Sequence, residues 1–107
     1  MDEAQRHPPA IEIERQLLAA LCSPALDQPT RTAILSALRA YTFADPDHDV
    51  IFRVLAEMPS NTAEHIRETL GARLTRLGFP DIDVYPIFEL EPPSEEKIGL
   101  LLRQLGR

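Results

Sequence analysis

The sequence has no tryptophan, four glycines and one cysteine among its 107 residues. Aromatic residues make up 6% of the chain and hydrophobic residues 44%, so the core must be aliphatic. Leu, Ile and Ala are expected to supply most of this core. Together with the low glycine content, this composition favours helices over strands. The single cysteine, Cys22, cannot form an intrachain disulfide, which is typical of a reducing compartment. Its place in the apolar stretch LLAALCSP indicates a buried side chain rather than a nucleophile.

Long apolar runs are also missing, because no stretch approaches the ~20 residues that a membrane-spanning helix needs. The N-terminal segment lacks the apolar region of a signal peptide, so we expect a cytoplasmic protein with no membrane contact. The net charge is −6, with ten Arg and a single Lys scattered among 17 acidic residues. An overall negative field repels nucleic acid, which disfavours DNA or RNA as a partner.

The apolar pattern predicts one helical domain, residues 10–107, after a flexible N-terminal tail, residues 1–9. Helices are expected from residue 10 to Pro24, over 30–41, from Pro46 to before Pro59, over 63–77 with Asn61 or Thr62 as the cap, and after Ser94. Residues 79–93 contain four prolines and predict an extended strip or a short helix. The fold class is therefore all-α, a small orthogonal bundle of five to six short helices. The predicted core consists of Leu17, Leu18, Leu21, Leu38, Ile51, Phe52, Leu55, Ile66, Leu70, Leu74, Leu101 and Leu102.

The stretch YTFADPDHDVIF, residues 41–52, places four ionisable side chains within five positions. Helix initiation explains each acid: Asp45 is a good N-cap, Pro46 fits the first helical position, and Asp47 and Asp49 fall where the helix dipole favours negative charge. Phe43 can fold back onto the helix in a staple-like contact. On this reading His48 has a structural role, near Phe43 and the first helix.

A metal-dependent hydrolase that uses the pair His48–Asp49 is the alternative. Such a site needs several converging ligands, and only His7 and His65 remain as further histidines. The sequence also has no G-x-x-x-x-G-K-[ST] loop and no G-x-S-x-G motif. We therefore predict no enzyme, with no catalytic, cofactor-binding or metal-binding residue and no cofactor.

Two motifs resemble the N-terminal domain of DnaB-type replicative DNA helicases. FADPDHDVIF, residues 43–52, is similar to a family pattern of Phe, any residue, a polar residue, often Pro, any residue, His, usually Arg, an aliphatic residue, Ile and Phe. Asp49 departs from this pattern, because Arg is common there. IEIERQLLAAL, residues 11–21, is similar to the first helix of that domain. In residues 11–21 the residues that fit the family are Glu14, Leu18, Ala19 and Leu21. In residues 43–52 they are Phe43, Asp45, Pro46, His48, Ile51 and Phe52.

The resemblance covers about residues 11–55 and fades beyond Met58. The helicase-binding C-terminal domain of bacterial primase has a similar helical fold and similar motifs. In the helicases the ATPase lies in a separate domain, and the N-terminal domain helps to build the collar of the ring and meets primase. The resemblance thus implies a non-enzymatic docking and oligomerisation module whose partners are another copy of itself, as a homodimer, or replication proteins.

Two further expectations concern the surface. Arg67, Arg73 and Arg76 on the predicted helix 63–77 could contact nucleic acid, although Glu64 and Glu68 flank Arg67 and favour a solvated, salt-bridged face. The apolar stripes of that helix and of the last one predict either a contact with a partner or part of the chain's own core. The interface candidates are Leu70, Leu74, Leu77, Ile98, Leu102 and Leu105.

Overall fold

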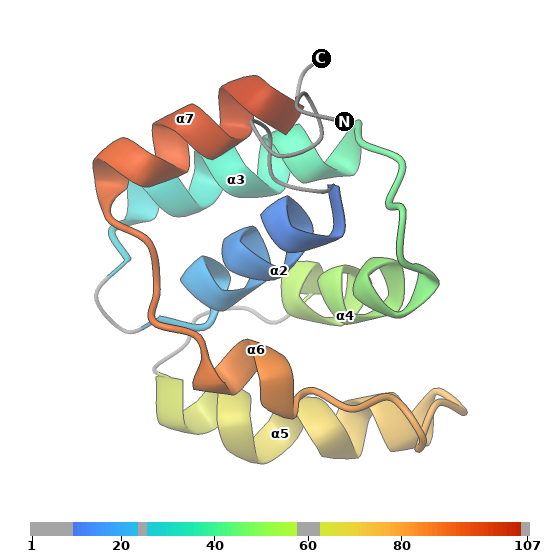
Figure 1. Ribbon diagram of the computed structural model, residues 1–107. Coiled ribbons are helices and arrows are strands. Elements are labelled where there is room, and N and C mark those ends of the chain that lie inside the picture. The colour runs from blue at the N-terminus through green and yellow to red at the C-terminus, as the bar shows by residue number, and fades with distance from the viewer. Residues whose placement is uncertain (1–9, 24–25, 58–62, 106–107) are drawn as a thin grey trace.

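The computed structural model describes residues 10–23, 26–57 and 63–105. These residues form six helices and no strand (Figure 1). The helices are α2 (Ala10–Leu21), α3 (Gln28–Arg39), α4 (Pro46–Glu57), α5 (Ala63–Arg76), α6 (Tyr85–Glu89) and α7 (Glu95–Leu105). The predicted all-α fold is confirmed, and within 79–93 the chain forms a short helix rather than a strand.

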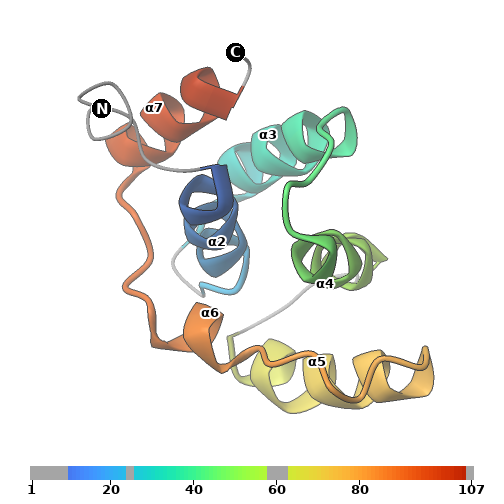
Figure 2. The same ribbon diagram turned by 45° about the vertical axis from the view of Figure 1, so that its right-hand side comes forward.

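Helix α2 lies at the centre of the bundle and packs against α3, α4, α6 and α7. Helices α3 and α7 lie on one side of it, and α5 and α6 lie on the other (Figure 1). The same order is visible after a 45° turn in Figure 2. Because neighbours surround the second half of α2, the five consecutive residues 17–21 are all buried, as expected where a helix is apolar on every side.

Local capping sets the ends of the helices. Asp27 Oδ1 accepts a hydrogen bond from the Thr30 backbone N–H at 3.1 Å, so α3 begins at Gln28, two residues earlier than predicted. The hydroxyl of Ser94 accepts from the Lys97 N–H at 3.2 Å and begins α7, as predicted. Gly78, with φ 98°, ends α5. These caps are local, and most of the helix boundaries follow from them.

The core is aliphatic, as the composition predicts. Every predicted core residue is buried except Leu102, which is half-buried and packs against the core. Cys22 is also buried, as its apolar stretch indicates. Within the described ranges, no helix has the length and apolar character to cross a membrane. The predicted N-terminal tail and the candidate caps Asn61 and Thr62 lie outside the described residues.

Candidate functional site

Helix α4 begins as its sequence predicts. Asp45 Oδ1 accepts a hydrogen bond from the Asp47 N–H at 2.9 Å, and the Asp45 carbonyl accepts from the N–H groups of His48 and Asp49 at 3.0 and 3.2 Å. Pro46 occupies the first helical position, where its missing N–H costs nothing. This start turns the side chain of His48 toward α2.

The side chain of Glu14, on α2, is completely buried and accepts hydrogen bonds from four residues. Its Oε2 accepts from the Tyr41 hydroxyl and the Ala44 N–H, each at 2.6 Å. Its Oε1 contacts His48 Nδ1 at 2.9 Å and the Asp45 N–H at 3.3 Å. We call Glu14, Tyr41, Ala44, Asp45 and His48 the Glu14 cluster. Four donors compensate for the water that this carboxylate has lost.

His48 is the second buried polar residue of the cluster, with 5% of its surface exposed. Since a carboxylate only accepts hydrogen bonds, Nδ1 of His48 carries the proton in the contact with Glu14. The other ring nitrogen, Nε2, faces Asp45 Oδ2 at 3.7 Å. The ring is therefore held between one carboxylate from α2 and another at the start of α4.

The Glu14 cluster is closed and saturated. Within the described part of the chain, every buried side-chain nitrogen or oxygen has a hydrogen-bond partner. The nearby cleft, about 560 Å³, lies on the outer side of the loop between α3 and α4 and is lined by Tyr41 and Phe43 but not by Glu14 or His48. A catalytic acid or base must be able to reach its substrate. The hydrogen bonds of the Glu14 cluster instead connect the start of α4 to α2.

Aromatic rings pack next to the Glu14 cluster. Phe43 lies edge-on to Tyr41 with ring centroids 5.2 Å apart, and it lies 5.6 Å from the ring of Phe52. Such pairs add to the stability gained by burying their area. Phe43 thus packs back onto α4, as the staple-like contact predicts. The motif residues Leu18, Ile51 and Phe52 are buried in the core.

Replacing His48 with Ala should lower the free energy of unfolding by about 1–3 kcal/mol, because Glu14 loses a partner inside the core. Urea denaturation followed by circular dichroism measures the loss. Asp47→Ala is the control, since Asp47 is exposed one position away. If the two variants unfold at the same urea concentration, His48 has no structural role.

The phenol of Tyr41 makes stability sensitive to alkali. Burial, and then the hydrogen bond to the neighbouring Glu14 carboxylate, raise the pKa of Tyr41 well above the ordinary tyrosine value of 10.0. The folded protein therefore holds this proton more tightly than the unfolded chain, whose tyrosine titrates near 10. The contribution is complete below that pH and is lost as the pH rises through the higher pKa of the folded state.

We therefore expect stability to fall as the pH rises above about 10, partly through Tyr41. Tyr41→Phe should show a smaller fall over this range, although its stability at neutral pH is lower because the bond to Glu14 is gone. Tyr85→Phe is the matched control, since Tyr85 is 64% exposed. An unchanged fall in Tyr41→Phe would contradict this role of the phenol.

The two residues of the proposed metal pair face different surroundings. His48 is buried against Glu14, whereas Asp49 accepts from Arg53 Nε and Nη2 at 3.3 and 3.2 Å on the outer face of α4. Among the side chains that the structure describes, no three His, Cys, Asp or Glu residues are grouped to hold a metal ion. His7 and the side chain of His65 lie outside the described part. The hydrolase alternative thus has no assembled ligand set in that part.

The surface candidates are distributed unevenly. Leu70, Leu74 and Ile98 lie in the core with at most 2% exposure, so the intramolecular alternative holds for them and they offer no surface to a partner. Leu102 and Leu105 are half-buried against the core, and Leu77 alone is exposed, at 59%. The side chains of Arg73 and Arg76 are exposed, whereas that of Arg67 lies outside the described part.

Sequence reasoning did not foresee the cluster itself. Tyr41 appeared there only as the last residue of the predicted helix 30–41, and Glu14 only as part of a motif. One signal was available: Glu14 shares a helical face with Leu18 and Leu21, and a carboxylate on an apolar stripe needs a buried donor. Nothing local indicates that the donors come from the loop before α4.

Comparison with known proteins yields no relative for this chain. No family model, no curated protein and no solved structure matches it. The function is therefore inferred from the residues of the chain and from their geometry.

Proposed function

We propose that this chain is a non-enzymatic helical module that binds protein chains, similar to the N-terminal domain of DnaB-type replicative helicases. One observation carries the proposal: the two motifs of the resemblance meet in space. Glu14, from the motif at 11–21, contacts His48, from the motif at 43–52, at 2.9 Å. Two patterns that match independently along the chain thus form one structural unit.

The chemistry of the unit supports a binding role. Glu14 and His48 are buried and contact each other, so they hold helices in place instead of meeting a substrate. The cleft beside the Glu14 cluster is open to solvent. Its lining includes Tyr41, Phe43, Arg39 and Arg53. Aromatic and Arg side chains are enriched where proteins contact one another.

The partners that follow from the resemblance are a second copy of the chain and bacterial primase. Light scattering from low to high micromolar concentration measures self-association. Fluorescence anisotropy of labelled protein, titrated with purified bacterial primase, measures hetero-association. Saturable binding in either experiment supports the proposal, and a monomer that does not bind primase opposes it.

The enzymatic alternative has its own test. Purified protein is incubated with Mn²⁺, Fe²⁺ or Zn²⁺ and a phosphodiester substrate, and product is followed over time. We expect no turnover above that of His48→Asn. Metal-dependent hydrolysis by the wild-type chain that His48→Asn abolishes would show that the module is an enzyme.

A further inference from the structure

The cleft beside the loop between α3 and α4 has an apolar floor. Leu38 and Phe52, which line it, are buried in the core. Tyr41 and Phe43 are half-buried in its wall, with their rings edge-on and their centroids 5.2 Å apart. Pro46 adds an exposed ring at the start of α4. A large apolar side chain that enters the cleft therefore meets aromatic surface, as the anchor residues of many protein interfaces do.

The two basic residues that line the cleft differ in their partners. Arg53 is exposed on α4, and its Nε and Nη2 donate to the Asp49 carboxylate at 3.3 and 3.2 Å. Arg39 is exposed in the last turn of α3, and among the described residues no acidic side chain lies within 4.0 Å of its guanidinium. The lining thus contains two arginines and one aspartate, and the aspartate is already paired with Arg53. The guanidinium of Arg39 is available to a partner.

The Glu14 cluster fixes the wall of the cleft. The Tyr41 hydroxyl and the backbone N–H groups of Ala44 and Asp45 all donate to the buried carboxylate of Glu14. These donors lie on both sides of Phe43 along the chain, so the loop that carries the two aromatic rings is held at both ends. A surface that is fixed before binding loses little conformational freedom when a partner docks. The buried cluster thereby prepares an exposed cleft for binding.

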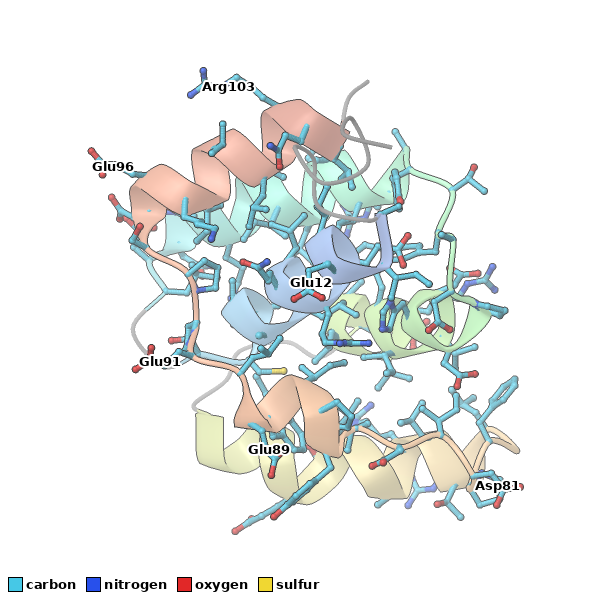
Figure 3. All side chains as sticks on the ribbon, viewed as in Figure 1. Glu12, Asp81, Glu89, Glu91, Glu96 and Arg103 are labelled. Carbon is cyan, nitrogen blue, oxygen red and sulfur yellow. The ribbon has the colours of Figure 1, made fainter. Side chains whose placement is uncertain are left out.

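The charge of the cleft favours an occupant that carries a single carboxylate. A guanidinium binds a carboxylate through two parallel hydrogen bonds. Nucleic acid or an anionic membrane needs several cations, and the net charge of −6 repels both. Glu91 and Glu96 lie on the left of the bundle in Figure 3, whereas the loop between α3 and α4 lies on the right in Figure 1. These two acids are therefore too distant to repel a carboxylate at Arg39.

We propose that this cleft binds a linear segment of a partner protein in which an Asp or Glu stands next to a large apolar residue. The apolar side chain packs on Tyr41 and Phe43, and the carboxylate pairs with Arg39. The inference rests on the proposed function, because it names the surface and the chemistry through which the module recognises another protein chain. It requires no second copy of this chain.

Random peptides displayed on phage are the first probe. The library is selected on the wild-type protein and, in parallel, on Arg39→Glu. We expect the wild type to enrich peptides with Asp or Glu beside Phe, Leu or Trp. Arg39→Glu should lose these peptides, because it places like charges together. Failure of the wild type to enrich such peptides, or equal enrichment on both proteins, overturns the proposal.

Fluorescence anisotropy of one enriched peptide, synthesised with a label, measures the contact with Arg39. Arg39→Glu should raise the Kd about tenfold or more while its helical circular dichroism stays unchanged, since Arg39 is exposed. Arg103→Glu is the matched control, because Arg103 is also exposed in the last turn of a helix and points away from the bundle in Figure 3. A peptide with Lys in place of its acid should bind Arg39→Glu better than the wild type. Equal Kd values for Arg39→Glu and Arg103→Glu overturn the pairing.

The cleft and the proposed function can fail separately. A chain that binds primase but enriches no acidic peptide overturns the cleft and leaves the proposed function in place. A chain that binds acidic peptides through Arg39, yet neither self-associates nor binds primase, overturns the likeness to the helicase domain and leaves the cleft in place. Labelled oligothymidylate that binds the wild type and is displaced by the peptide would assign the cleft to nucleic acid and overturn the inference.

Discussion

Glu14→Ala should destabilise the protein by about 3–5 kcal/mol, the usual result of removing one partner from a buried, charged network. The substitution leaves the Tyr41 hydroxyl, the His48 ring and two backbone N–H groups without their acceptor, and it removes the charged partner of the buried His48. Domains of this size have a free energy of unfolding of about 5–15 kcal/mol, so the loss is a large fraction of the total. Thermal and urea denaturation followed by circular dichroism measure it.

Glu12→Ala provides the matched control on the same helix. Glu12 is partly exposed, and its carboxylate lies 3.9 Å from Arg15, a surface pair worth about 0–1 kcal/mol. Glu14→Gln should fall between the two, because its amide oxygen still accepts while its NH₂ group faces donors. If Glu14→Ala melts at the same temperature as Glu12→Ala, the Glu14 cluster does not hold α2 and α4 together.

Phe52→Ala should lower the free energy of unfolding by about 3–5 kcal/mol, because removing the aromatic ring leaves a cavity in the core. Phe52 is 5% exposed and lies against the ring of Phe43 at 5.6 Å. Domains of this size have a free energy of unfolding of about 5–15 kcal/mol. A protein near the low end of that range would lose most of its stability, and the variant would be largely unfolded at 37 °C. Urea midpoints at 25 °C give the size of the effect.

Phe79→Ala removes the same side chain from the surface. Phe79 is 43% exposed, so its truncation should change the stability of the monomer far less than that of Phe52. Equal midpoints for the two variants would mean that Phe52 does not serve as a core residue.

The helices and most of the core could be predicted because their signals are local. Apolar residues at steps of three and four define α5, and Asp45 with Pro46 starts α4 wherever the rest of the chain lies. The predicted start of α3 lies two residues late, because the cap is Asp27, whose carboxylate accepts from the Thr30 N–H. For these elements a window of a dozen residues contains the physical cause.

The Glu14 cluster could not be predicted, because its cause lies between distant segments. The apolar stripe with Leu70 and Leu74 has the same sequence pattern whether α4 or another protein covers it. The packing of α4 on α5 shows that these residues belong to the core of the chain itself. Glu14 carries an acidic side chain in a helix, which local rules assign to the surface. Its burial depends on donors that a different loop supplies.

The spacing of the Glu14 contacts constrains the order of folding. The four donors follow Glu14 by 27, 30, 31 and 34 residues. During synthesis α2 and α3 leave the ribosome first, and at that stage the carboxylate can only remain hydrated. The carboxylate has its full set of four contacts only after residue 48 has emerged. A nascent chain that stops before that residue should therefore stay open to protease, and one that extends well beyond it should acquire protection in a single step.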